Sequence, residues 1–193
     1  MNTLPPTPIL ESTETITLGK KYDYLRMHLR TPKGKAQSRE MVRHPGAVVI
    51  VPVLPNGDVV LIRIFRVAIQ QWVWECCAGT IERPRNADGS FGRGEDPAVC
   101  AARELLEETG YRPGTLKPLA EFYTTPGLTD ERMHAFLAMD LELLEPRREE
   151  DEYIVVEVMP AQRALSMLDA GEINDGKTMT ALLLALRAGA LRE

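Results

Sequence analysis

The sequence predicts an α/β protein in which a small antiparallel β arm precedes the main domain. Short runs of alternating or β-branched residues, bounded by turn-forming residues, indicate strands. The stretch 97–109 has the caps and the apolar spacing of a helix. With 193 residues, 44% of them hydrophobic, the chain is long enough to bury a sizeable core.

The arm is predicted for residues 1–43 and the main domain for residues 44–193. Residues 1 to about 12 include Pro5, Pro6 and Pro8, so we expect a loose tail there. Strands of the arm are expected at 14–18, 22–30 and 36–43, with a turn at 31–35.

The main domain opens with two β-rich runs, at 48–54 and 59–65. Residues 55–58 between them, Pro-Asn-Gly-Asp, are typical of a hairpin turn. Further strands are expected at 119–123, 134–139 and 154–158, and further helices at 160–170 and from 176 to about 188.

The helix predicted at 97–109 carries an unusual charged face. Asp96 before Pro97 is an N-cap signal, and Gly110 is a stop signal. Glu104, Glu107 and Glu108 lie three and four residues apart, so a helix stacks their carboxylates, which costs about 0.2–0.5 kcal/mol for each pair of like charges. A solvated charged face is one interpretation. The other is a cation site, because carboxylate oxygens suit magnesium, manganese or calcium.

The longer pattern decides between them. Residues 103–111 read Arg-Glu-Leu-Leu-Glu-Glu-Thr-Gly-Tyr, and Glu95 precedes Arg103 by eight positions. This stretch resembles the Nudix box, whose hydrolases cleave nucleoside diphosphates linked to another group with the help of divalent cations. The resemblance implies an α/β/α sandwich with a mixed sheet and one face covered by this helix.

The entry to the box resembles one branch of that family. Residues 74–79 match the W-E-x-x-A-G segment of ADP-ribose pyrophosphatases, in which the glycine begins the box. Gly79 is therefore preferred over Gly89, which lies in a polar, turn-forming stretch. On this alignment residues 83–93 are an insertion beside the metal site, and we expect it to affect substrate specificity.

Two later segments resemble the same branch. Residues 126–131, P-G-x-T-D-E in pattern, correspond to a loop expected to reach the terminal ribose; a plain surface loop is the alternative. Residues 147–152 are an acidic cluster, usually a solvated loop, from which the resemblance takes Glu150 as general base and Glu152 as an outer metal ligand.

The resemblance thus implies a complete set of site residues. Glu95, Arg103 and Glu150 form the catalytic set, in which Glu95 and Arg103 orient the helix carboxylates. A tryptophan and arginines beside the helix could stack a base and pair with phosphate, or could equally be core and surface residues. The metal ligands are Ala78 (by its carbonyl), Glu104, Glu107, Glu108 and Glu152, and the substrate-binding residues are Arg63, Arg66, Trp72, Glu75, Pro126, Asp130 and Glu131.

The implied reaction is Mg²⁺-dependent hydrolysis of ADP-ribose to AMP and ribose 5-phosphate, with Mn²⁺ as an alternative metal. Alternative substrates are another nucleoside diphosphate sugar or a dinucleotide, such as a GDP-sugar, NADH or FAD. A non-catalytic ADP-ribose sensor is a third alternative, although all the box carboxylates are present. The resemblance also implies a homodimer assembled through the β arms.

Composition excludes several other classes. The formal charge of −5 and the lack of a basic run argue against a nucleic-acid partner. No stretch has the length or apolarity of a membrane span, and the N-terminus does not resemble a signal peptide. Cys76, Cys77 and Cys100 lack the spacing of a metal or redox motif. We therefore expect a cytoplasmic protein.

Overall fold

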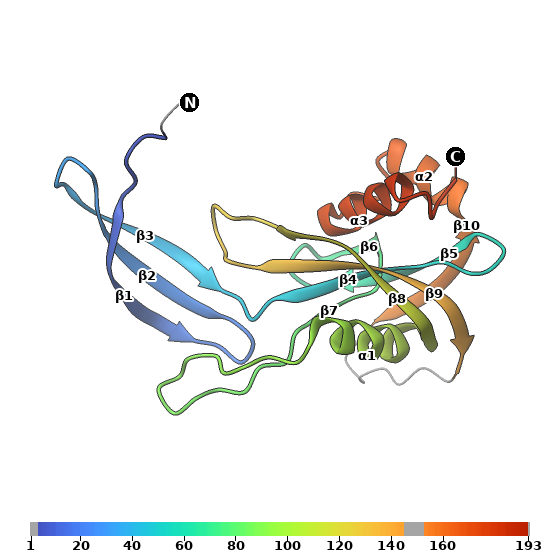
Figure 1. Ribbon diagram of the computed structural model, residues 1–193, viewed down its shortest axis with the longest axis horizontal. Coiled ribbons are helices and arrows are strands. Elements are labelled where there is room, and N and C mark those ends of the chain that lie inside the picture. The colour runs from blue at the N-terminus through green and yellow to red at the C-terminus, as the bar shows by residue number, and fades with distance from the viewer. Residues whose placement is uncertain (1–3, 145–152, 193) are drawn as a thin grey trace.

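The computed structural model describes residues 4–144 and 153–192 and contains an arm and a layered α/β domain (Figure 1). The arm is a separate antiparallel sheet in the order β1-β2-β3. Its strands are β1 (Ile9–Leu18), β2 (Asp23–Arg30) and β3 (Ala36–Arg43). β1 begins inside the segment expected to be a loose tail, because Ile9 and Leu10 pair with the end of β2.

Two sheets form the centre of the domain. One has the order β7-β4-β9-β8, and the other has the order β10-β5-β6. Only β4 and β9 run parallel within them, so the predicted mixed sheet is confirmed. The strands are β4 (Ala47–Pro52), β5 (Asp58–Arg66), β6 (Gln71–Glu75), β7 (Ala78–Thr80), β8 (Tyr111–Tyr123), β9 (Arg132–Leu143) and β10 (Ile154–Pro160).

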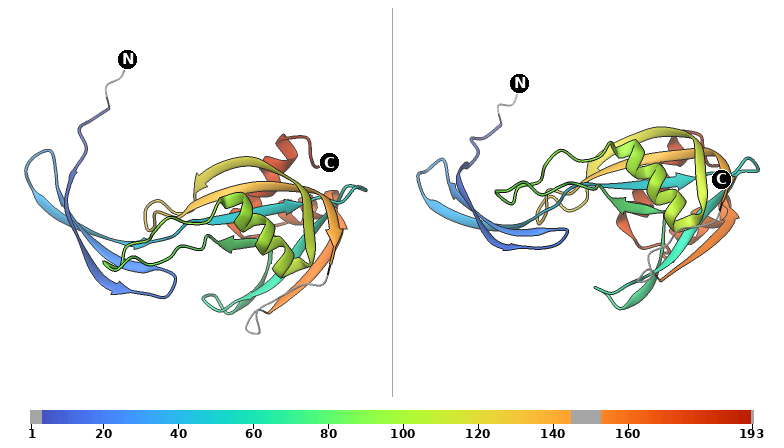
Figure 2. Two further views of the ribbon diagram at one scale, coloured as in Figure 1. Left: turned by 60° about the horizontal axis from the view of Figure 1, so that its bottom comes forward. Right: turned by 90° about the horizontal axis from the view of Figure 1, so that it is seen from below.

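Helices cover both faces of the sheet that contains β4 (Figures 1 and 2). α1 (Pro97–Thr109) lies on one face, and α2 (Ala161–Asp169) and α3 (Gly176–Arg187) lie on the other. Alternate residues of β4 belong to two apolar clusters, Val48 and Ile50 to the one with α1, Val49 and Val51 to the other. All of β4 is buried, which explains its continuous apolar run.

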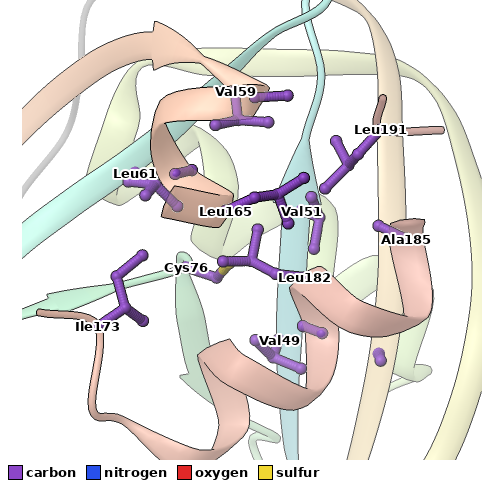
Figure 3. Close-up of a cluster of buried hydrophobic side chains, with 14 of the residues drawn as sticks. Val49, Val51, Val59, Leu61, Cys76, Leu165, Ile173, Leu182, Ala185 and Leu191 are labelled. Carbon is purple, nitrogen blue, oxygen red and sulfur yellow. The ribbon is translucent and has the colours of Figure 1, made fainter. Parts of the chain in front are cut away.

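The larger apolar cluster lies between the sheets and the C-terminal helices (Figure 3). Leu165 of α2 and Leu182 of α3 pack there against Val51 and Leu61. Cys76 is fully buried in the same cluster, and its backbone N–H donates to Thr178 Oγ1 at 2.9 Å. Burial raises the pKa of the Cys76 thiol, so this thiol is a neutral core group.

The main differences from the predicted elements concern strand length. β8 starts at Tyr111, although only 119–123 was expected to be a strand. Pro113, Gly114 and Pro118 weaken its local signal, but pairing with the long β9 keeps the segment extended, with a bulge between Pro118 and Ala120. β6 and β7 were not predicted as strands. Both are short, and β7 has three residues.

Candidate active site

The caps predicted for α1 are confirmed. Asp96 accepts a hydrogen bond from the Ala98 N–H at 2.8 Å, and Pro97 occupies the first turn. Gly110 adopts the left-handed conformation, with φ of 80°, and its N–H donates to the Leu106 carbonyl at 2.9 Å. Cys100, Ala101 and Leu105 are buried against the sheet. This packing turns Arg103, Glu104 and Glu107 toward one cleft.

The glycine that begins the site is Gly79 in β7. A Cβ atom built on Gly79 would lie 1.9 Å from Cδ of Glu104, so any other residue at position 79 would force this carboxylate out of its place beside the strand. Gly89, by contrast, lies in a surface turn with φ of 79°, where its N–H donates to the Asn86 carbonyl. The preference for Gly79 is therefore confirmed by the packing.

Arg103 is the only cation of the Nudix-like helix and contacts three carboxylates at once. Its guanidinium lies 2.7 Å from Glu95, 2.8 Å from Glu104 and 3.0 Å from Glu107. Glu95 also accepts a hydrogen bond from the Glu82 N–H at 3.0 Å. Burial by itself raises the pKa of Glu95, but hydrogen bonds from Arg103 and the Glu82 N–H outweigh it and hold that pKa below its ordinary value.

Glu108 is the most buried acid of the helix, with 4% of its surface exposed. It accepts a hydrogen bond from the Ala78 N–H at 3.3 Å, which ties the end of α1 to the start of β7. Glu104, Glu107 and Glu108 all line one cleft of about 990 Å³, together with Ala78 and Gly79. Residues of the arm and of the inserted loop also line this cleft: Lys20, Lys21, Tyr22, Arg83, Pro84, Phe91 and Arg93.

A second cavity, of about 570 Å³, adjoins this cleft across β7, because both are lined by Tyr22, Arg66 and residues 78–80. Glu131 lines it and accepts a hydrogen bond from Thr124 Oγ1. His44 lies 3.4 Å from Glu131, and its Nδ1 accepts the Gly46 N–H at 3.0 Å, so the ring proton is on Nε2. Burial lowers the pKa of His44 despite Glu131 and Asp130.

Glu75, a predicted substrate-binding residue, lines neither cavity but pairs with two cations, Arg66 and Lys177, that line the second one. It is 1% exposed and accepts hydrogen bonds from Arg66 Nε at 2.7 Å and Nη2 at 2.6 Å. Lys177, near the start of α3, also pairs with Glu75 and lies 3.0 Å from Asp175. Glu75 thus holds the Arg66 and Lys177 side chains at the cavity. It would contribute to ligand binding there only through these two cations.

The structure does not bring every predicted substrate residue to the cavities. Among the described residues, Arg63, Trp72, Pro126 and Asp130 line neither of them. Arg63 lies over the Trp74 ring at 5.2 Å, Trp72 packs edge-on against Phe65, and Asp130 accepts the His44 N–H at 2.7 Å. Glu150 and Glu152 lie outside the described residues. The roles given to these residues stay predictions.

Tyr22, His44 and Lys177 are among the residues of the second cavity that were not predicted from the sequence. Tyr22 and His44 stack with ring centroids 4.7 Å apart, although Tyr22 was seen only as part of an arm strand. Lys177 is the third, and its only signal was its place in a C-terminal segment that resembles the family. None of the three lies near the box in sequence, so no local pattern could assign them to the site.

The donor chemistry of the cleft fits a hard divalent cation, because Glu104, Glu107 and Glu108 supply carboxylates beside the Ala78 backbone. Within the described residues, no three acidic, histidine or cysteine side chains already form a chelating group. Arg103 meanwhile pairs with Glu104 and Glu107. A metal and Arg103 would therefore share these carboxylates.

The comparisons with known proteins agree with this geometry. The family model described as NUDIX domain matches residues 42–182, so the chain belongs to the Nudix family, and it is a Nudix hydrolase. An ADP-ribose pyrophosphatase of Bacillus subtilis is 38% identical over 171 residues, 88% of this chain and 87% of that protein. The predicted resemblance to that branch is confirmed.

Other relatives carry different names. A methanol dehydrogenase activator of Bacillus methanolicus is 33% identical and covers 88% of each chain. A GDP-mannose pyrophosphatase of Escherichia coli O1:K1 is 34% identical over 88% of this chain and 94% of that protein. A crystal structure of an ADP compounds hydrolase superposes with a TM-score of 0.80 at 21% identity, over 97% of this chain and 96% of that one, which confirms the predicted fold.

Proposed function

We propose that this Nudix hydrolase cleaves the diphosphate of ADP-ribose to give AMP and ribose 5-phosphate, with Mg²⁺ as metal and Mn²⁺ as a substitute. The observation that carries the proposal is the joined pair of cavities around β7. One holds the helix carboxylates, and the other has room for a sugar between Glu131 and Lys177. The 38% identity to an ADP-ribose pyrophosphatase favours this substrate.

The metal would be held by Glu104, Glu107 and Glu108, with the Ala78 carbonyl as a further ligand. Bound there, a divalent cation neutralises phosphate oxygens and lowers the pKa of a coordinated water. Glu95 and Arg103 have a positioning role, because Arg103 bridges Glu95 to the two carboxylates at 2.8 and 3.0 Å. Glu152 as outer ligand and Glu150 as general base complete the proposal.

The substrate would span both cavities. Arg66 lines both of them and can pair with phosphate, while Glu75 fixes its guanidinium. Glu131, braced by Thr124 and His44, would accept hydrogen bonds from ribose hydroxyls. Pro126 and Asp130 would shape that loop, and Arg63 and Trp72 would bind the base only if they rearrange.

We further propose a homodimer in which residues 1–43 pair the subunits and residues 44–193 form the hydrolase domain. Support comes from the arm, where β1 is exposed along its whole length and Ile9, Leu10, Ile16 and Leu18 expose 37–69% of their surface. No described helix is long and apolar enough to span a bilayer. Three free, buried thiols suit the cytoplasmic location that the proposal includes.

The test is hydrolysis of a substrate panel by the purified protein with Mg²⁺ or Mn²⁺. ADP-ribose, GDP-mannose, NADH and FAD are compared by chromatography of the products. The highest kcat/KM for ADP-ribose, with AMP as product, is expected. A higher value for GDP-mannose would favour the alternative substrate named by the 34% identical relative. Binding of ADP-ribose without cleavage of any compound would overturn the proposal in favour of a sensor.

A further inference from the structure

The inserted loop 83–93 is fastened to the β arm by a buried carboxylate. Asp23, the first residue of β2, has a side chain that is 0% exposed. Arg85 of the loop donates to both of its carboxylate oxygens at 2.7 Å. Arg43, the last residue of β3, donates to the same carboxylate from Nε at 2.9 Å. Two guanidiniums from separate segments thus converge on one acid.

Aromatic and backbone contacts complete this cluster. The Phe91 ring lies 4.1 Å from the Arg85 guanidinium and 5.4 Å from that of Arg43. Arg85 also donates to the Gly19 carbonyl at 3.1 Å, and both arginines donate to the Gly89 carbonyl. We call Asp23, Arg43, Arg85 and Phe91 the arm clamp. Figure 2 shows the loop lying beside the arm strands.

The two arginines of the arm clamp keep the buried Asp23 side chain ionised. Burial by itself raises the pKa of Asp23, but the hydrogen bonds from Arg85 and Arg43 hold that pKa below its ordinary value. Removing the Asp23 charge would leave the two guanidiniums beside each other without the acid to which both donate. The loop would then be repelled from the arm, because like charges would meet where an ion pair held them.

The segments joined by the clamp form one wall of the metal cleft. Lys20, Lys21 and Tyr22 lead directly into Asp23, and Arg83 and Arg93 flank the clamped part of the loop. All five line the same cleft as the carboxylates of α1. Within residues 4–144 and 153–192, the two lysines and these two arginines form no ion pair. We call Lys20, Lys21, Arg83 and Arg93 the cationic wall.

We propose that the cationic wall binds the diphosphate-bearing substrate in the cleft that it shares with the α1 carboxylates, and that Asp23 is the positioning residue that holds the wall in place. The inference rests on the proposed function, because it assigns the wall to the same substrate. Asp23 itself lines neither cavity, so its effect must pass through Arg85 and the loop. A wall that helps to bind substrate, without touching the metal ligands, changes KM more than kcat.

The kinetic test uses Asp23→Asn and Arg85→Ala in the full chain. Each is expected to raise KM for ADP-ribose by about tenfold while kcat stays within about twofold. Arg85→Lys keeps the charge but loses the two-pronged contact, so its KM should lie between those of wild type and Arg85→Ala. Arg30→Ala is the matched control, because Arg30 pairs with Glu11 elsewhere on the arm at 2.5 Å. Its KM should be unchanged.

Limited digestion with trypsin tests whether the arm clamp holds the loop in place, and it does not depend on enzymatic activity. Trypsin can cut after Lys20, Lys21, Arg85 and Arg93 but not between Arg83 and Pro84. Mass spectrometry should show faster cutting after Lys21 and Arg93 in Asp23→Asn than in wild type. If Asp23→Asn does not fold, Arg85→Ala carries both tests, because Asp23 keeps Arg43 in that variant.

Failure of the proposed ADP-ribose hydrolysis and failure of the arm clamp would give different results. A wild type that cleaves no compound of the panel overturns the proposed function, while proteolysis still reports on the clamp. An active wild type with unchanged KM in Asp23→Asn overturns the substrate role of the wall, even if cutting is faster. Unchanged cutting and unchanged KM together overturn the clamp itself.

Discussion

The arm clamp and the α1 cluster both combine arginines with carboxylates, but in opposite ratios of positive to negative charge. In the arm clamp, one carboxylate, Asp23, pairs with Arg43 and Arg85. On α1, one guanidinium, Arg103, pairs with Glu95, Glu104 and Glu107, and Glu108 lies nearby in the same cleft. The residue types are the same, but the first cluster has an excess of positive charge and the second of negative charge.

The ratio of arginines to carboxylates distinguishes a cluster that joins two segments of the chain from a cluster that can bind a cation. The arm clamp satisfies its buried acid completely with protein groups, so it joins two segments and needs no ligand. The α1 cluster has more carboxylates than guanidiniums, because Arg103 is shared by Glu95, Glu104 and Glu107. We therefore propose that a divalent cation binds there, since carboxylate oxygens are its preferred ligands. Substitutions in the two clusters should therefore have different effects: those on α1 on metal-dependent activity, and those in the arm clamp on stability.

Glu108→Gln should lower kcat/KM for the preferred substrate by about a thousandfold, because the site loses a charged ligand for the metal. The fold should survive, since a glutamine oxygen can still accept the Ala78 N–H. Steady-state kinetics and a thermal melt measure both properties. Glu107→Gln, at a side chain 39% exposed, is the milder comparison. A melted Glu108→Gln protein would make Glu108 a structural residue instead.

Asp23→Asn should lower the free energy of unfolding by about 2–3 kcal/mol at neutral pH, because it breaks a buried ion pair. The pKa of Asp23 is lowered from 3.8, so the unfolded chain binds more protons than the folded one between the two pKa values. The advantage of wild type is therefore fully present above about pH 5 and shrinks as the pH falls through the folded-state pKa. Urea unfolding of both proteins from pH 3 to 7 measures the difference. A difference that is constant with pH would contradict the clamp.

Arg103→Gln should destabilise the metal-free protein by about 1–2 kcal/mol, because Glu95, Glu104 and Glu107 lose their shared cation. Mg²⁺ should then raise Tm more in this variant than in wild type, since binding to the folded state adds stability. Calorimetry with and without Mg²⁺ gives both values. Equal Mg²⁺-induced shifts would show that Arg103 and the metal do not share carboxylates.

Shortening the inserted loop should change substrate preference more than metal affinity. The Gly92 N–H donates to the Pro84 carbonyl at 2.8 Å, so an Asn-Gly turn in place of residues 85–91 closes the loop where its two strands already pair. The replacement also removes Arg85 and Phe91 of the arm clamp. We expect the ratio of kcat/KM for ADP-ribose and GDP-mannose to shift by about tenfold. The Mg²⁺ concentration for half-maximal rate should stay the same. An unchanged ratio would separate the loop from specificity.

Arg112→Ala should have the smallest effect. Arg112 pairs with Glu142 at the surface, where their side chains are 59% and 55% exposed. Exposed pairs contribute about 0–1 kcal/mol, so Tm and kcat should both be close to wild type. If Arg112→Ala lowered stability as much as Asp23→Asn, an exposed ion pair would stabilise the protein as much as a buried one, and burial would not explain the strength of the arm clamp.

Much of the site could be predicted from sequence because it lies within one helix. Asp96, Gly110 and the three glutamates are fixed by local spacing, and the structure places them as expected. The resemblance favoured Gly79 over Gly89, and the close approach of Glu104 to Gly79 gives a physical reason for a glycine there. Arg63 and Trp72 were predicted from their residue types near the helix; in the structure Arg63 lies over Trp74 and Trp72 packs against Phe65, and their substrate-binding roles stay predictions.

The sequence by itself determined the family, the capped helix and its excess of negative charge, because these depend on residues close together along the chain. Only the tertiary structure decided that Asp23 meets Arg85, that Tyr22 stacks on His44, and that Glu75 holds Lys177. The pairs Asp23–Arg85 and Glu75–Lys177 are separated by 62 and 102 positions. Such contacts arise when sheets and helices pack, so they leave no local pattern from which they could be predicted.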